Sequence, residues 1–127
     1  MSYGRLVQVL IVDAANVVGS RPDGWWRDRA GAASRLWEQL VSARLPHDET
    51  VLVLEGAGRA GVPTGRTDRV LTTHASGSGD DAIVETVAAR VADGWEVTVV
   101  TADRALRLRV ENAGAATAGP SWLLDRL

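Results

Sequence analysis

The stretch QVLIVDAANVVGS, residues Gln8 to Ser20, decides the fold. Residues 6–12 are aliphatic apart from Gln8, and such a run is typical of a strand covered on both faces, as strands of a parallel sheet are. Asp13 then stands where this strand should leave the sheet. Aspartate is favoured at turns of this kind, but it also suits the first member of a functional site. The rest of the chain has to show whether the pattern repeats.

The composition predicts one globular domain. The chain has 127 residues, no cysteine and a formal net charge of −2, and its length suits a single domain. The lack of cysteine excludes disulfides, thiolate zinc sites and a cysteine nucleophile, and the slightly acidic charge argues against a strongly basic nucleic-acid module. Because no apolar run has the length of a membrane span and no signal peptide is seen, we expect a cytoplasmic protein that does not bind membranes.

Segments typical of strands and of helices alternate along the chain. Strands are expected at residues 6–12, 50–54, 69–73 and 96–100, where short apolar runs occur. Helices are expected at 31–44, 80–92 and 105–110, where apolar residues recur every three or four positions. The glycine-rich segment 56–67 is expected to be a loop. This alternation predicts a three-layer α/β fold with a central parallel sheet of four or five strands flanked by helices.

Four aspartates follow the predicted strands or begin the helices after them. Asp13 and Asp103 end the first and fourth strands, and Asp80 and Asp81 begin the helix after the third. In a parallel sheet these positions meet at the carboxyl edge, where α/β folds carry their sites. Asp80, Asp81 and Asp103, taken singly, suit a helix N-cap or first turn better than a metal ligand, but the common location of the four aspartates favours a site. Crowded carboxylates need a cation, and oxygen ligands favour Mg²⁺ or Mn²⁺.

Helix geometry separates the two adjacent aspartates of the predicted helix 80–92. Asp80 lies three and seven residues before Ile83 and Val87, which belong to the apolar stripe of that helix. Asp81 lies four residues before Glu85, on a side that we expect to face solvent. Asp80 is therefore the stronger candidate for a metal ligand, and Asp81 is an additional one.

Three sequence motifs resemble the PIN-like ribonuclease superfamily, and in particular its NYN branch. They are IVDAANVV (residues 11–18), GSGDDAIV (77–84) and VVTAD (99–103), and they span most of the chain. The resemblance implies a single NYN/PIN-like domain over residues 1–127, with a divalent-metal site and hydrolysis of phosphodiester bonds in single-stranded RNA. The catalytic metal ligands that it implies are Asp13, Asp80 and Asp103. Asn16 would then be a polar contact to the site or the substrate, and Thr101 would support the site.

Two positions depart from the NYN pattern. Proteins of this branch often carry a further aspartate two residues after the last one, where this chain has Ala105. Their lysine–glycine approach to the middle aspartate is replaced here by residues 78–79, a serine and a glycine. A second metal ion would therefore need another acid, and Asp81 and Glu55 are the candidates. Glu55 ends the second predicted strand, a position that is equally typical of a solvated acid.

Tryptophan and arginine side chains near the same edge predict contacts with RNA. The segment after the first strand, GSRPDGWWRDR (residues 19–29), holds Trp25 and Trp26 between arginines. Aromatic faces stack on unpaired bases while arginine neutralises phosphate; the alternative is that the tryptophans plug the core or form a dimer contact. Arginines in predicted loops or helix starts are expected to bind phosphate, with a solvated surface position as the alternative. They are Arg21, Arg59, Arg66 and Arg104.

Two other functions fit the same sequence. The first is hydrolysis of a nucleotide or another small phosphate ester, although neither a Walker loop nor a Nudix-type run of glutamates is present. The second is a non-catalytic RNA-binding or interaction module, which Ala105 and the modest net charge favour. Small PIN domains often act as toxins held by an antitoxin. An antitoxin or other protein partner and a homodimer are therefore both open, and no residue of the chain identifies a partner.

Overall fold

Residues 8–13, the first part of the stretch Gln8 to Ser20, form a central strand of the sheet. The computed structural model describes residues 6–127 and places β1 (Gln8–Asp13) inside a six-stranded sheet with the order β3–β4–β2–β1–β5–β6. Neighbouring strands are parallel except β3 and β4, which are antiparallel. The remaining strands are β2 (Glu49–Leu54), β3 (Gly65–Thr67), β4 (Val70–His74), β5 (Glu96–Val100) and β6 (Ala116–Ala118). The predicted α/β fold with a central, mostly parallel sheet is confirmed, but the sheet has six strands instead of the four or five expected.

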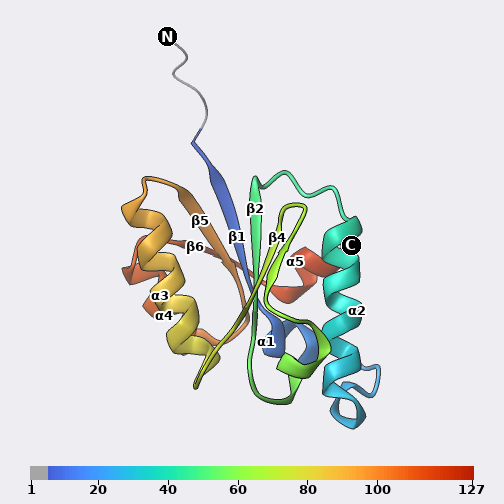
Figure 1. Ribbon diagram of the computed structural model, residues 1–127. Helices are drawn as coiled ribbons and strands as arrows, with labels where there is room; N and C mark the ends of the chain where they lie inside the picture. The colour runs from blue at the N-terminus through green and yellow to red at the C-terminus, as the bar shows by residue number, and fades with distance from the viewer. Residues whose placement is uncertain (1–5) are drawn as a thin grey trace.

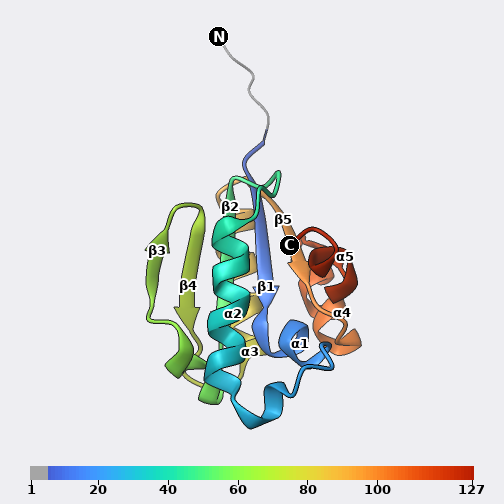
Figure 2. The ribbon, with the colours of Figure 1, turned by 90° about the vertical axis from the view of Figure 1, so that its right-hand side faces the viewer.

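Helices cover both faces of the sheet and complete three layers. Figures 1 and 2 show α3 and α4 on one face, and α1, α2 and α5 on the other. The helices are α1 (Ala14–Gly19), α2 (Arg29–Ser42), α3 (Gly79–Ala92), α4 (Arg104–Asn112) and α5 (Pro120–Leu124), with 3₁₀ turns η1 (Trp25–Arg27) and η2 (Gly56–Gly61). Within residues 6–127, no helix has both the length and the apolar character needed to cross a membrane.

Burial on both faces explains the unbroken apolar run of β1. Leu10 and Val12 pack in the core on the α2 side, and Val9 and Ile11 pack in the core on the α3 side. All four side chains are fully buried, and each contributes about 1.5–3 kcal/mol relative to an exposed position. Side chains along a strand alternate between the two faces. Odd-numbered residues of β1 therefore face α3, and this rule also governs the residue that ends the strand.

Several short elements were not expected from the sequence. Residues 14–19, for which no helix was predicted, form α1, and the predicted loop 56–67 contains η2 and the edge strand β3. Residues 116–118, for which no strand was predicted, form β6. The residues of β3 are all exposed and those of β6 are alanine and threonine, so neither strand carries an apolar pattern. The contacts with β4 and β5, rather than local preference, determine these strands.

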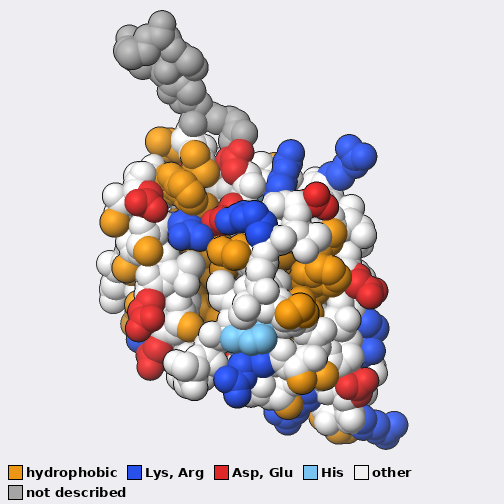
Figure 3. All heavy atoms as spheres, in the orientation of Figure 1, with side chains coloured by type: hydrophobic (Ala, Val, Ile, Leu, Met, Phe, Trp, Pro, Cys, Tyr) orange, Lys and Arg blue, Asp and Glu red, His pale blue; other side chains and the backbone are white. Residues whose placement is uncertain are grey.

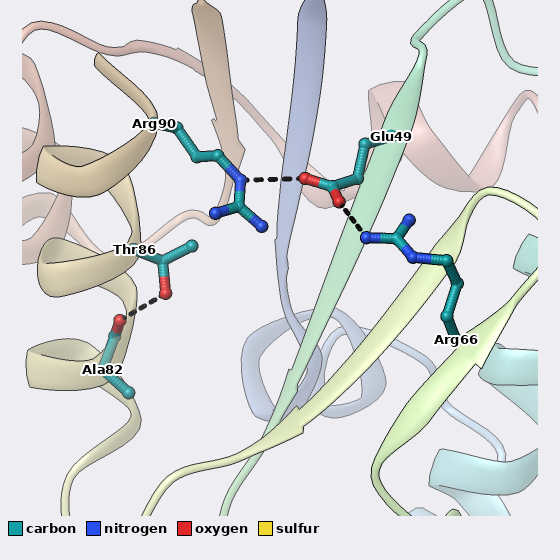
Figure 4. A network of polar contacts seen from close by, with 5 residues as sticks. All are labelled: Glu49, Arg66, Ala82, Thr86 and Arg90. Atoms are coloured by element: carbon teal, nitrogen blue, oxygen red, sulfur yellow. Dashed lines mark hydrogen bonds and ion pairs between the residues drawn. The ribbon is translucent and has the colours of Figure 1, made fainter. Parts of the chain in front are cut away.

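Two ion pairs of the buried Glu49 join three elements at the amino edge of the sheet (Figure 4). Glu49, the first residue of β2, is 6% exposed and binds Arg66 of β3 at 2.6 Å and Arg90 of α3 at 2.9 Å. The expectation that Arg66 contacts phosphate beside the aspartates is therefore wrong. The antiparallel return of β3 carries Arg66 away from the carboxyl edge, and the interpretation of this segment as a loop concealed that turn.

Candidate active site

The strand order puts a topological switch point between the carboxyl ends of β1 and β5, a place that we call the crevice. The chain leaves β1 toward β2 on one side of the sheet, and β5 and β6 lie on the other side of β1. Such a reversal of strand order is where open α/β sheets bind their ligands, outside the carboxyl ends of the strands. Asp13 is the last residue of β1, and residues 101–103 follow β5 directly. Two of the predicted site segments therefore meet at this crevice.

Asp13 is a buried carboxylate held by two hydrogen bonds. It is 6% exposed; its Oδ2 accepts from the Thr101 hydroxyl at 2.9 Å, and its Oδ1 accepts from the backbone N–H of Asn16 at 3.4 Å. Burial raises the pKa of Asp13 to about 6, against the effect of these two hydrogen bonds, and the negative charges of Asp80 and Glu55 add to the rise. The carboxylate is thus fixed in position and poorly solvated.

Thr101 joins the ends of β1 and β5. Its side chain is fully buried, and its hydroxyl donates to Asp13 while accepting from the backbone N–H of Asp103 at 3.2 Å. A hydroxyl can donate and accept at the same time, which valine, of similar shape, cannot do. This geometry agrees with the supporting position predicted for Thr101.

Asn16 connects α1 to the loop between β5 and α4. Its Oδ1 accepts from the backbone N–H of Ala102 at 2.8 Å. Asn16 is half-buried, one turn of helix after Asp13. The predicted role as a polar contact to the site is compatible with this bond, which also gives Asn16 a part in holding the crevice together.

Asp80 and Asp103 lie at the starts of α3 and α4. Asp80 is half-buried, and its pKa is raised by burial first and then by the negative charges of Asp103 and Glu55, against the positive charge of Arg109. Asp103 is exposed, and its Oδ1 caps α4 by accepting from the backbone N–H of residue 106 at 3.0 Å. Asp81 is exposed and pairs with Arg109 at 2.9 Å. The expectation that Asp80 faces inward and Asp81 faces solvent agrees with these exposures.

Glu55 is the acid whose place the sequence left most open. It follows β2, is half-buried, and its Oε2 accepts from the backbone N–H of Gly79 at 2.7 Å, which brings it to the first turn of α3. An alternation rule could have found this. Asp13 ends β1, while Glu55 and Thr101 directly follow β2 and β5. The odd-numbered residues of these three strands, such as Ile11, Val53 and Val99, pack on the α3 side. All three therefore face the same side of the sheet.

The acids are gathered without forming a finished metal site. Burial is the main cause of the raised pKa values of Asp13 and Asp80; repulsion by Asp80 and Glu55 adds to the rise for Asp13, and repulsion by Asp103 and Glu55 adds to it for Asp80. All the donor atoms of these acids are oxygens, which suits Mg²⁺ or Mn²⁺. Among the side chains of residues 6–127, no group of three acids or histidines is already arranged to hold a metal ion. A cation would have to draw the carboxylates together. The metal site stays a prediction.

The structure separates the residues predicted to contact substrate. Arg104, the first residue of α4, is exposed beside Asp103. Arg59 donates to the backbone oxygens of residues 56 and 75, close to the end of β2. Arg21 instead donates to Gln39 of α2 at 2.6 Å, and it lines a hollow along α2 that includes none of the four carboxylates.

The adjacent tryptophans differ in their surroundings. Trp25 is half-buried and packs against the core on the α2 side, whereas Trp26 is 55% exposed. Their rings meet edge to face, with centroids 5.9 Å apart and an interplanar angle of 88°. The alternative interpretation, that the pair helps to close the core, therefore applies to Trp25 in part and does not apply to Trp26.

Comparisons with known proteins give a match of fold. No protein-family model and no curated protein sequence matches the chain. Among solved structures, the chain is similar to Rae1 (YacP) from Bacillus subtilis, whose crystal structure was determined as the W164L mutant. The TM-score is 0.72 and the sequence identity is 18%, and the match covers 93% of this chain and 73% of Rae1. At this identity the likeness is one of fold, and membership of the NYN branch stays a prediction.

Proposed function

We propose that this protein is a divalent-metal-dependent ribonuclease that hydrolyses phosphodiester bonds in single-stranded RNA. The observation that supports it most is the set of acids at the crevice: a buried, hydrogen-bonded Asp13 repelled by Asp80 and Glu55. Like charges that repel one another in the folded state reduce its stability. A bound cation would remove that repulsion, and phosphoryl transfer is the reaction that such cations assist at oxygen-only sites.

Each residue has a defined task in this proposal. Asp13, Asp80 and Asp103 would hold the cation, and Glu55 would serve as an outer acid while it fixes the start of α3. When bound, the cation stabilises negative charge on the phosphate and on the leaving oxygen. Thr101 orients the Asp13 carboxylate.

The mixed surface charge favours RNA binding through a few local contacts rather than along a broad basic surface. On the face drawn in Figure 3, acidic and basic side chains of the described residues are interspersed, and the whole chain has a net charge of −2. Broad attraction to a phosphate backbone needs a continuous basic surface. Phosphate contacts would therefore come from single arginines at the crevice, and the exposed Arg104 at the start of α4 is the first candidate.

The test is cleavage of an end-labelled, unstructured RNA with Mg²⁺, with Mn²⁺ and with a chelator, alongside nucleoside triphosphates and a simple phosphate monoester. We expect metal-dependent cleavage of RNA that leaves 5′-phosphates. Cleavage of the small esters alone would identify a nucleotide or phosphate-ester hydrolase. RNA binding without cleavage would identify a non-catalytic module, and either result would overturn the proposal.

A pair of adjacent variants tests the assignment of the acids. We expect Asp80→Asn to lower the cleavage rate by more than about 100-fold, because even residues that only support metal ligands contribute about 10–100-fold. Asp81→Asn removes an exposed ion pair with Arg109 and should change the rate only a few-fold. Equal losses would show that both acids bind metal. Circular dichroism of both variants controls for folding.

A further inference from the structure

A groove lies on the α2 side of the carboxyl edge, next to the acids. Its volume is about 410 Å³, within the range of small-molecule sites. Trp25, Arg29 and Glu55 contribute large side chains to its lining, and small residues such as Ala14 and Gly58 line much of the rest. A flat ring could approach the backbone closely at these small residues, because no bulky side chain stands in the way.

Trp25 and Arg29 give the groove a preference for a flat ring next to a negative charge. The guanidinium of Arg29, on the first turn of α2, lies 5.3 Å from the centroid of the Trp25 ring. The neighbouring Trp26 ring meets Trp25 edge to face, but Trp26 itself does not line the groove. An aromatic face and an arginine together are what proteins use to bind single-stranded nucleic acids, where the ring stacks on a base and the cation neutralises phosphate.

The groove and the acids occupy the two sides of one sheet edge. Val12 and Leu54 belong to the core on the α2 side, while Asp13 and Glu55, one residue further along, turn toward α3. Glu55 borders both spaces, since it lines the groove and bonds to Gly79. A nucleic-acid strand that crosses this edge could place a phosphate at the acids and a neighbouring base in the groove.

We propose that this groove binds the base of a nucleotide next to the scissile phosphate of single-stranded RNA. Trp25 stacks on the base, and Arg29 neutralises a phosphate beside it. Trp26 and Arg21 have no part in this contact, since neither lines the groove. The inference rests on the proposed ribonuclease function and adds to it a subsite that selects for an unpaired base.

Two substitutions in the groove and one outside it test the proposal. Binding of a fluorescein-labelled hexaribonucleotide is measured by anisotropy in the Asp103→Asn background, so that cleavage does not interfere. Trp25→Leu should weaken binding by about 5- to 150-fold, the range that corresponds to 1–3 kcal/mol per stacked base. Trp26→Leu is the matched control and should leave affinity unchanged. Trp25→Phe should restore most of the lost affinity.

Gly58→Val gives a test that leaves Trp25 intact. A Cβ at Gly58 would meet only the Cβ of Ala33 at 3.8 Å, an ordinary contact, so the variant should fold. Its side chain would occupy part of the groove and should weaken binding several-fold. An abasic hexanucleotide completes the cycle: the wild-type groove should bind it more weakly than the intact RNA, and Trp25→Leu should bind both alike.

The outcomes separate this inference from the proposed function. If RNA is cleaved but the groove variants bind like the parent, the groove proposal is wrong and the nuclease proposal stands. If no cleavage occurs but binding depends on Trp25 and on the base, the groove binds a base as proposed and the nuclease proposal is wrong. Equal losses in Trp25→Leu and Trp26→Leu would also overturn the groove proposal, because only Trp25 lines it.

Discussion

At the scale of single residues, the Asp13 carboxylate is placed where its charge is unfavourable for folding. Its pKa is 3.8 in the unfolded chain and about 6 in the folded protein, chiefly because of burial. The folded state therefore binds the proton more tightly, and the ionised carboxylate destabilises it. This penalty is small below about pH 4, grows as the pH rises from about 4 to about 6, and levels off above that at up to roughly 3 kcal/mol.

Asp13→Asn should therefore stabilise the metal-free protein at neutral pH. The variant loses the charge penalty and about 1 kcal/mol from one hydrogen bond, so we expect a net gain of about 1–2 kcal/mol at pH 7.5 in urea unfolding. At pH 4 the gain should vanish, while metal-dependent cleavage is lost at any pH. Asp23→Asn, at an exposed loop position, is the control. A variant that is destabilised equally at both pH values would make Asp13 a structural turn residue.

The sequence identified the aspartates through their positions, but not the detailed contacts between them. Asp13, Asp80 and Asp103 could be picked out because each lies at the carboxyl end of a strand or at the helix start that follows. Glu55 stayed ambiguous because its bond to Gly79 joins residues 24 positions apart. The place of Arg29 over the Trp25 ring cannot be predicted from the sequence, since it depends on how η1 and α2 pack.

At the scale of elements, the predictability of each segment follows the strength of its apolar pattern. β1, β2 and β5 are aliphatic and were located to within about two residues, while β3 and β6 offered no such signal. α1 has six residues, fewer than an isolated helix needs in water. It forms because Asp13 caps it and Val17 is buried beneath it, and neither cause is visible in a helical periodicity.

The start of α3 depends on a glycine in contact with Glu55. A Cβ at Gly79 would lie 2.9 Å from Cδ of Glu55, so Gly79→Ala must displace this carboxylate from the backbone N–H that it accepts from. Because Glu55 is flexible and alanine favours helix, the free energy of unfolding should change by less than about 1 kcal/mol. Cleavage at limiting Mn²⁺ should fall several-fold.

Gly119→Ala is the matched control for this prediction. An added Cβ at Gly119 meets the Arg107 guanidinium at 3.7 Å, an ordinary contact, and Gly119 is not part of the groove lining, so the variant should cleave RNA at the wild-type rate. If Gly79→Ala behaves in the same way at every Mn²⁺ concentration, Glu55 is a helix cap without a part in the site.

At the scale of the whole molecule, the ion pairs of Glu49 and the acids of the candidate site lie at opposite edges of the sheet. Glu49 holds β3 and α3 at the amino edge (Figure 4), and the acids lie at the carboxyl edge. Glu49→Gln leaves two arginines without their anion and should lower the free energy of unfolding by about 1–3 kcal/mol. Arg66→Gln should cost less than about 1 kcal/mol, because the Arg66 side chain is 51% exposed.

Cleavage measurements complete this prediction. Urea unfolding gives the loss of stability, and the cleavage rate per folded molecule should stay at the wild-type value in both variants. A rate that falls together with stability would mean that the amino edge influences the carboxyl edge through the sheet.

The uniform burial of β1 has a consequence for how the strand finds its place. Residues 9–12 are aliphatic and fully buried on both faces. A shift of β1 by one residue along its axis would therefore replace one aliphatic side chain by another at most of these positions. Hydrophobicity alone gives little protection against such slippage, which would turn Asp13 toward α2. Hydrogen bonds at the two polar ends of β1 fix its register: the Gln8 N–H donates to Asp48 at 2.8 Å, and the Thr101 hydroxyl donates to Asp13. Asp13, which is proposed to serve catalysis, thus also helps to fix the register of β1 in the sheet.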